Sequence, residues 1–189
     1  FYEKPMLKFD RVMETFLQTA PQTPLIFSRA MSSWFSEKFR LPERLKEDLG
    51  FDGKLLFASH HEAHAASAFF LSPYSDAAIL TVDGVGEWTT NALSRGNENR
   101  VTLMHELTFP HSLGLLYSSF TQYLGFRVNW GEYKVMGLAP YGNPIYADRI
   151  REQLIDIKED GSYRLFLDRF EFLSGKQMIA DAFGDVFGV

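Results

Sequence analysis

The sequence predicts an α/β domain in which helices flank a small antiparallel sheet, and two features of the residue pattern lead to this fold class. Apolar residues recur at helical spacing over residues 1–50 and again after residue 113, whereas residues 77–109 form strand-like segments separated by turns. The composition is sufficient for a hydrophobic core, because 46% of the 189 residues are hydrophobic and 15% are aromatic. We therefore expect a single folded unit.

Charge and composition exclude several classes of partner. The formal net charge is −5 and like charges form no long blocks, so we expect no nucleic-acid partner. The sequence holds no cysteine, which leaves histidine, aspartate and glutamate as candidate metal ligands. No apolar run approaches the roughly 20 residues that span a bilayer, and the first residues do not resemble a secretion signal. We accordingly expect no membrane partner and a cytoplasmic location.

Two or three helices are predicted before residue 50. Their apolar positions are spaced as on a helix face, and Pro21 and Pro24 separate the first helix from the second. Pro42 is expected to open a short third helix that ends before Gly50. The segment 54–59, with the sequence Lys-Leu-Leu-Phe-Ala-Ser, is then predicted to form a short buried strand that ends at His60.

A helix of small residues is predicted from Glu62 to Phe70, where its low bulk permits close packing against a sheet. Three strands and their turns follow and form a β-meander. The predicted strands are 77–82, 89–94 and 101–109, with a turn at 95–99. Beyond them we expect helices over 113–124 and 132–139, a helix to about residue 157, a turn at 160–161, a strand at 163–167 and a last helix.

A histidine pair at the start of the small-residue helix is the first candidate site. His60 and His64 are four residues apart, so their imidazoles share one helix face and can bind a single ion. Asp83 ends the next strand and is a candidate third ligand. The alternative is that both histidines are capping or core residues. The metallopeptidase motif H-E-x-x-H is absent, which argues against a simple metal hydrolase.

A glycine-rich hairpin, Asp83-Gly84-Val85-Gly86-Glu87, is the second candidate site. Glycine lets a backbone approach phosphate oxygens closely, and the hairpin resembles the phosphate loops of the actin, sugar-kinase and Hsp70 superfamily. The alternative is an ordinary Asp-Gly turn between two strands.

A third candidate is the helix start from Gly131 to Lys134, where backbone amides and a lysine are expected to receive an anion. Its alternative is a plain helix cap with a surface lysine. Upstream, Ser112 is expected to cap a helix in which Tyr117 packs, and His105 and His111 are expected to be structural.

Taken together, these segments resemble the NodU/CmcH family of O-carbamoyltransferases. The matching stretches occur in the order found in the family and cover residues 1 to about 145. They are Tyr2-Glu3-Lys4-Pro5, the segments 59–70, 81–88 and 109–117, and the segment 131–142.

The resemblance implies a two-domain enzyme whose first domain has an actin-like ATPase fold, related to RNase H, and whose second domain is similar to YrdC. The second domain makes carbamoyl-adenylate from carbamoyl phosphate and ATP, and the first transfers the carbamoyl group to a hydroxyl of a small-molecule or oligosaccharide acceptor. A divalent metal, usually Fe(II), is implied at His60, His64 and Asp83. Nucleotide contacts are expected at the hairpin and the helix start, and a base is expected either at Glu62 or at a residue outside residues 1–189. The nucleotide-contacting residues are Gly84, Gly86, Glu87, Gly131 and Lys134.

The family's opening strand, a fourth ligand and the YrdC-like domain have no match within residues 1–189. We therefore expect this chain alone to be inactive in carbamoyl transfer and to bind metal weakly. Two alternatives remain open: a threonylcarbamoyl-type transferase acting on tRNA, and a scaffold that dimerises through the aromatic residues Trp34, Phe35 and Phe39. The sequence leaves the acceptor open.

Overall fold

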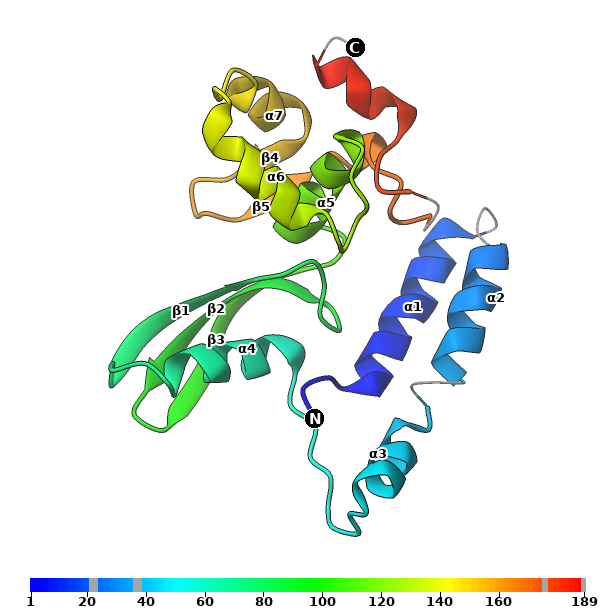
Figure 1. The fold of residues 1–189 in the computed structure, drawn as a ribbon, viewed down its shortest axis with the longest axis vertical. Coiled ribbons are helices and arrows are strands. Elements are labelled where there is room, and N and C mark those ends of the chain that lie inside the picture. The colour runs from blue at the N-terminus through cyan, green and yellow to red at the C-terminus, as the bar shows by residue number, and fades with distance from the viewer. Residues whose placement is uncertain (21–23, 36–38, 175–176, 188–189) are drawn as a thin grey trace.

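The computed structural model describes residues 1–20, 24–35, 39–174 and 177–187. The chain opens with three helices, α1 Pro5–Thr19, α2 Pro24–Ser33 and α3 Leu41–Leu49, and α1 lies against α2 (Figure 1). Gly50 ends α3 with a φ of 58°, a left-handed conformation that suits glycine. The predicted N-terminal helices are confirmed, while Pro21 lies outside the described residues.

The predicted β-meander is confirmed as a three-stranded antiparallel sheet of order β1-β2-β3. Its strands are β1 Asp76–Val82, β2 Thr89–Asn97 and β3 Arg100–Thr108. β2 is longer than predicted, because Gly96 is extended within it and lies over the ring of Phe69. A Cβ atom on Gly96 would be 2.5 Å from that ring. The expected five-residue turn is therefore reduced to a tight turn at Glu98, whose φ is 52°.

Helix α4, His60–Phe69, covers one face of this sheet (Figure 1). Ala65 and Phe69 pack on Ile79 of β1, and Ala65 is completely buried. The small residues of α4 thus allow the close approach to the sheet that the sequence predicts. The helix begins two residues earlier than predicted, at the first histidine of the candidate site.

The buried strand predicted at 54–59 is wrong. This segment is extended but belongs to neither sheet, and Leu56 is 68% exposed. Its backbone bonds are to Phe1, whose ammonium donates to the Leu56 carbonyl at 2.7 Å and whose carbonyl accepts from the Ala58 amide at 2.9 Å. An apolar run alone does not show whether a neighbouring strand covers it.

The second half of the chain packs around a separate hydrophobic cluster that contains Leu154, Phe183 and Val186. The predicted helices at 113–124 and 132–139 are confirmed. The elements are α5 Leu113–Tyr123, α6 Glu132–Leu138, the 3-10 helix η2 Ala139–Tyr141, α7 Ala147–Gln153, β4 Ile155–Ile157, β5 Tyr163–Leu165, and the 3-10 helices η3 Leu167–Arg169 and η4 Asp181–Phe187.

Two predictions for this half need correction. The helix expected to continue to residue 157 ends at Gln153, because Ile155 and Ile157 pair with β5 and Ile155 is buried. The last helix is a 3-10 helix, in which Phe183 and Val186 are buried against the cluster. Local helical spacing did not reveal these contacts between residues distant in sequence.

The fold is mixed α/β, with two small antiparallel sheets. The actin-like assignment stays a prediction. Within the described ranges, no helix combines the length and apolar character needed to cross a membrane.

Candidate metal centre

The structure brings His60, His64 and Asp83 together, so that one ligand atom of each lies within 4.8 Å of the others. The Nε2 atom of His60 is 2.6 Å from Oδ2 of Asp83 and 3.0 Å from Nε2 of His64. The Nε2 atom of His64 is 3.4 Å from the same Asp83 oxygen. Helix α4 presents both imidazoles on one face, and Asp83 reaches them from the end of β1.

These three atoms suit a divalent cation by chemistry and by spacing. Two imidazole nitrogens and a carboxylate oxygen form a donor set that first-row divalent metals accept. Ligand atoms bound to a common ion at about 2.1 Å are separated by roughly 3.0 to 3.4 Å, and both contacts of His64 fall in that range. The 2.6 Å between Nε2 of His60 and Oδ2 of Asp83 is shorter and is the length of a direct hydrogen bond. The geometry therefore fits the metal that the sequence predicts.

Electrostatics keep the carboxylate of Asp83 ionised. Burial alone would raise the pKa of Asp83, but the amide of Gly84 and the imidazoles of His60 and His64 outweigh burial and lower it. The side chain of Asp83 is 35% exposed and that of His64 is 53% exposed. The three residues are thus open on the His64 side, where a further ligand or substrate can approach.

His60 is the more enclosed of the two histidines. Its side chain is 15% exposed, and the ring of Tyr2 lies 5.6 Å from its ring, centroid to centroid. The Nδ1 atom of His60 is buried and has no hydrogen-bond partner among the described residues. Metal-binding histidines usually donate this second N–H to an acceptor. The orientation of the His60 ring must therefore come from elsewhere in the structure.

The hairpin after β1 packs directly against the histidine pair. A Cβ atom on Gly86 would lie 2.8 Å from Cβ of His60, whereas one on Gly84 would meet nothing within 4 Å. The Gly84 amide donates to Oδ1 of Asp83 at 2.6 Å, and the Gly86 amide donates to the Thr89 carbonyl at 2.9 Å. The amides of both glycines are therefore already used within the hairpin, and the nucleotide contacts predicted for them stay a prediction.

The start of α5 holds this hairpin from the other side. The Ser112 hydroxyl donates to the Gly84 carbonyl at 2.6 Å and accepts from the Leu115 amide, which confirms the predicted helix cap. Gly114 lies so close to the hairpin that an added Cβ atom would be 2.4 Å from the carbonyl oxygen of Asp83. The position of Asp83 thus depends on a glycine 31 residues further along the chain.

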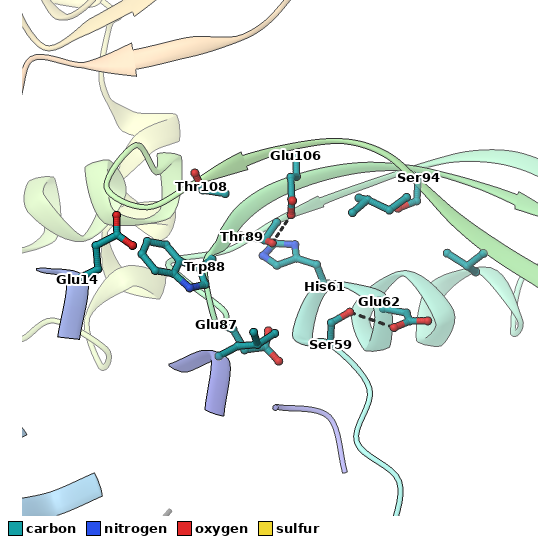
Figure 2. Close-up of a pocket in the computed structure, with 13 residues that line it drawn as sticks. Glu14, Ser59, His61, Glu62, Glu87, Trp88, Thr89, Ser94, Glu106 and Thr108 are labelled. Carbon is teal, nitrogen blue, oxygen red and sulfur yellow. Dashed lines mark hydrogen bonds between the residues drawn. The ribbon is translucent and has the colours of Figure 1, made fainter. Parts of the chain in front are cut away.

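Glu62 is not brought to the three ligands. It follows His60 by two residues, so at 100° per residue it lies on the opposite side of α4 from the histidine pair. Its carboxylate accepts from the Ser59 hydroxyl at 3.0 Å. Figure 2 shows this pair at the start of α4, on the border of a cleft of about 620 Å³ between α1, α4 and the sheet. The base role predicted for Glu62 stays a prediction.

The helix start at Gly131 packs on α5, whose first residues contact the hairpin. There the carboxylate of Glu132 accepts from the amides of Asn129 and Gly131, at 2.9 and 3.2 Å, and so occupies the place expected for an anion. The Lys134 ammonium lies 5.7 Å from the ring centroid of Phe126. Among the residues that the structure describes, no hydrogen bond or ion pair joins this helix start to His60, His64 or Asp83, and its nucleotide role stays a prediction.

Sequence reasoning missed one residue that supports the site and did not show the contacts of another. Tyr163 of β5 donates to Asn91 of β2 at 2.8 Å and accepts from the Leu113 amide at 3.0 Å, so it ties α5 to both sheets. Glu87, predicted to contact nucleotide, is 4% exposed, and its carboxylate accepts two backbone amides. The motif identified Glu87, but the sequence did not show where its carboxylate points.

Comparisons with known proteins identify the family of the chain. The whole chain, residues 1–189, matches the family described as carbamoyltransferase N-terminus. It is 50% identical over 196 residues to an uncharacterized protein of Synechocystis sp., with all of this chain and 32% of the relative covered.

Two nodulation proteins are also similar. The chain is 37% identical to NolNO of Sinorhizobium fredii, with 82% of the chain and 23% of the relative covered. It is 39% identical to NolO of Bradyrhizobium diazoefficiens, with 59% and 20% covered. The chain thus spans about a third or less of the length of these relatives. It belongs to the carbamoyltransferase family, as a NodU-type carbamoyltransferase N-terminal segment.

Proposed function

We propose that this chain supplies the metal centre for O-carbamoyl transfer, in which a carbamoyl group passes from carbamoyl-adenylate to a hydroxyl of a small-molecule or oligosaccharide acceptor. The acceptor oxygen would bond to the carbamoyl carbon, AMP would leave, and the hydroxyl proton would be released. Carbamoyl-adenylate would be made from carbamoyl phosphate and ATP elsewhere in the complete protein. Membership of the carbamoyltransferase family supports the reaction class. The convergence of His60, His64 and Asp83 on one point is the observation that carries the assignment to these residues.

Each of the three residues has a definable part in holding the metal, for which we propose Fe(II). Asp83 offers a carboxylate that stays ionised, since its pKa is lowered. His60 offers an imidazole fixed by the packed hairpin, and the exposed His64 completes the set on the open side. A bound divalent ion would supply Lewis-acid stabilisation of the negative charge that develops as the acceptor hydroxyl attacks the carbamoyl carbon.

The test is carbamoyl transfer by the complete protein with single ligands removed. Labelled carbamoyl phosphate and ATP would be supplied with a set of hydroxylated metabolites and oligosaccharides, and label in a stable carbamoyl ester would be measured. We expect His64→Ala and Asp83→Asn to abolish labelling, while His105→Ala, which removes an exposed imidazole on β3, leaves it unchanged. Undiminished labelling in His64→Ala would refute the assignment.

A further inference from the structure

The carboxylate of Glu87 lies between the starts of two helices. Its Oε1 atom accepts from the Lys4 amide, the residue before α1, at 2.7 Å, and its Oε2 atom accepts from the His60 amide, the first residue of α4, at 3.0 Å. The first amides of a helix have no partner within the helix, and the positive end of its dipole attracts an anion. One buried carboxylate therefore accepts one backbone amide at the start of each helix.

This geometry makes Glu87 a poor contact for a nucleotide. Both of its oxygens already accept backbone amides, and the residue is 4% exposed. Its negative charge would also repel phosphate oxygens. Glu87 therefore needs a different role within the hairpin.

The hairpin instead holds His60 at three points. Oδ2 of Asp83 is 2.6 Å from the Nε2 atom of His60, Gly86 packs beneath its Cβ atom, and Glu87 binds its amide. The side-chain contact from Asp83 fixes where the ring points. The other two contacts fix the backbone from which the ring projects.

Arg11 of α1 supports the same arrangement. Its guanidinium donates to the Gly86 carbonyl at 2.8 Å. Burial lowers the pKa of Arg11, while the carboxylates of Glu3 and Glu87 act in the opposite direction. A cation beside Glu87 offsets the cost of burying its charge. Helix α1 is thereby joined to the hairpin by both a cation and an amide.

We propose that Glu87 is a positioning residue of the metal centre, which holds the backbone of His60 so that its imidazole faces His64 and Asp83. This inference rests on the proposed metal site but adds a residue outside the ligand set. It also explains how the His60 ring keeps its direction although its Nδ1 atom has no partner among the described residues. Residues that orient a metal ligand change metal affinity when they are replaced.

The test uses Co²⁺ as a probe of the full chain, because its visible absorption reports the ligand geometry. Affinity, stoichiometry and spectrum would be measured for the wild type, Glu87→Gln and Glu87→Ala. Glutamine keeps the volume and one acceptor, whereas alanine keeps neither. We expect Co²⁺ affinity to fall by roughly 10- to 100-fold in Glu87→Ala, with a changed spectrum, and by less in Glu87→Gln.

The matched control is Glu132→Gln. Glu132 also accepts two backbone amides at a helix start, but at α6 rather than α4. We expect this variant to lose conformational stability in urea without any change in Co²⁺ affinity or spectrum. Loss of Co²⁺ affinity in both the Glu87 variants and Glu132→Gln would mean that lower stability alone weakens Co²⁺ binding. That result would overturn the proposal.

The remaining outcomes are also decisive. Wild-type affinity and spectrum in both Glu87 variants would overturn the positioning role while leaving the metal site intact. Absence of Co²⁺ binding by the wild type would overturn the metal site itself and the inference with it. If Glu87→Ala does not fold, as judged by circular dichroism, the result for Glu87→Gln decides.

Discussion

At the scale of single residues, the proposed metal centre depends on backbone contacts as much as on its three candidate ligands. Gly86 packs under the Cβ atom of His60, and the Gly84 amide donates to Asp83. Neither glycine is required by a left-handed conformation, since neither has a positive φ. The two glycines differ in the room that their surroundings leave for a Cβ atom, so alanine substitutions at the two positions can be compared.

We expect Gly86→Ala to destabilise the chain and Gly84→Ala to be tolerated. The new methyl group at position 86 would lie 2.8 Å from the Cβ atom of His60, and the overpacking should cost about 1–3 kcal/mol in the free energy of unfolding. At position 84 the methyl group meets nothing within 4 Å, so the change should stay within about 0.5 kcal/mol. Urea unfolding of both variants would measure this, and equal effects would contradict the described packing.

The histidine pair shows what the sequence can predict at this scale. Spacing of four residues on a helix predicts that His60 and His64 share a face, and the structure confirms it. The same spacing argument places Glu62 on the other side of α4, although it lies between the two histidines in sequence. The direction of Glu87 could not be predicted, because it depends on where α1 begins relative to the hairpin.

At the scale of secondary-structure elements, the start of α5 acts as a support for the hairpin. Ser112 caps the helix and binds the Gly84 carbonyl, and Gly114 allows the helix backbone to touch Asp83. Helix α5 therefore connects the second half of the chain to the proposed metal centre through its contacts with Gly84 and Asp83.

We expect Gly114→Ala to lower stability and to weaken metal binding, whereas Gly137→Ala in α6 should do neither. A methyl group at position 114 would be 2.4 Å from the Asp83 carbonyl oxygen, and backbone atoms cannot move aside as a flexible side chain can. At position 137 it meets nothing within 4 Å, and alanine is favoured over glycine in a helix by up to about 1 kcal/mol. Unfolding and Co²⁺ titrations would separate the two, and a harmless Gly114→Ala would contradict this account.

The hydrogen bond between His111, just before α5, and β5 predicts that the stability of the fold depends on pH. His111 accepts from the Leu165 amide through Nδ1 at 3.1 Å, and burial, with the charge of Arg164, lowers its pKa. The unfolded chain therefore binds a proton more readily than the folded chain, so His111 should make stability fall as the pH drops below about 6.5. Above that value both states are neutral and the effect vanishes.

His111→Asn tests the direction of this pH dependence, because the asparagine oxygen can accept a hydrogen bond from the Leu165 amide but does not titrate. We expect its free energy of unfolding to fall less steeply between pH 7 and pH 5 than that of the wild type, as measured in urea. His111→Gln loses the titration without placing an acceptor at Nδ1, so it should show the flatter profile with lower stability throughout. A wild-type slope in both variants would contradict the assignment.

Helices and strands were predicted well where the local residue pattern determines the structure. They were predicted poorly where contacts with residues distant in sequence determine it. The β-meander and helices α1 to α6 follow from proline, glycine and apolar spacing. The strand predicted at 54–59 is wrong because the segment pairs with no strand and Leu56 remains exposed. The helix expected to reach residue 157 ends early because Ile155 pairs with Leu165. No local signal distinguishes such pairing from the end of an amphipathic helix.

At the scale of the whole molecule, the residues of the proposed metal centre are supported by two hydrophobic clusters. Ala65, Phe69 and Ile79 form the cluster between α4 and the sheet, and the larger cluster around Phe183 holds α5 to the C-terminal elements. The first positions the histidines, and the second supports Asp83 through α5. The ligand set therefore depends on the packing of both clusters.

The most direct measurement of the central claim is an anaerobic calorimetric titration of Fe²⁺ into the full chain and its ligand variants. We predict one ion per wild-type chain and affinity reduced by at least about 100-fold in His64→Ala and Asp83→Asn, since each removes one of three ligands. His64 is 53% exposed, so its loss should leave the fold intact, and His105→Ala should bind as the wild type does. A wild-type chain that binds no ion, or a His64→Ala variant with unchanged affinity, would contradict the claim.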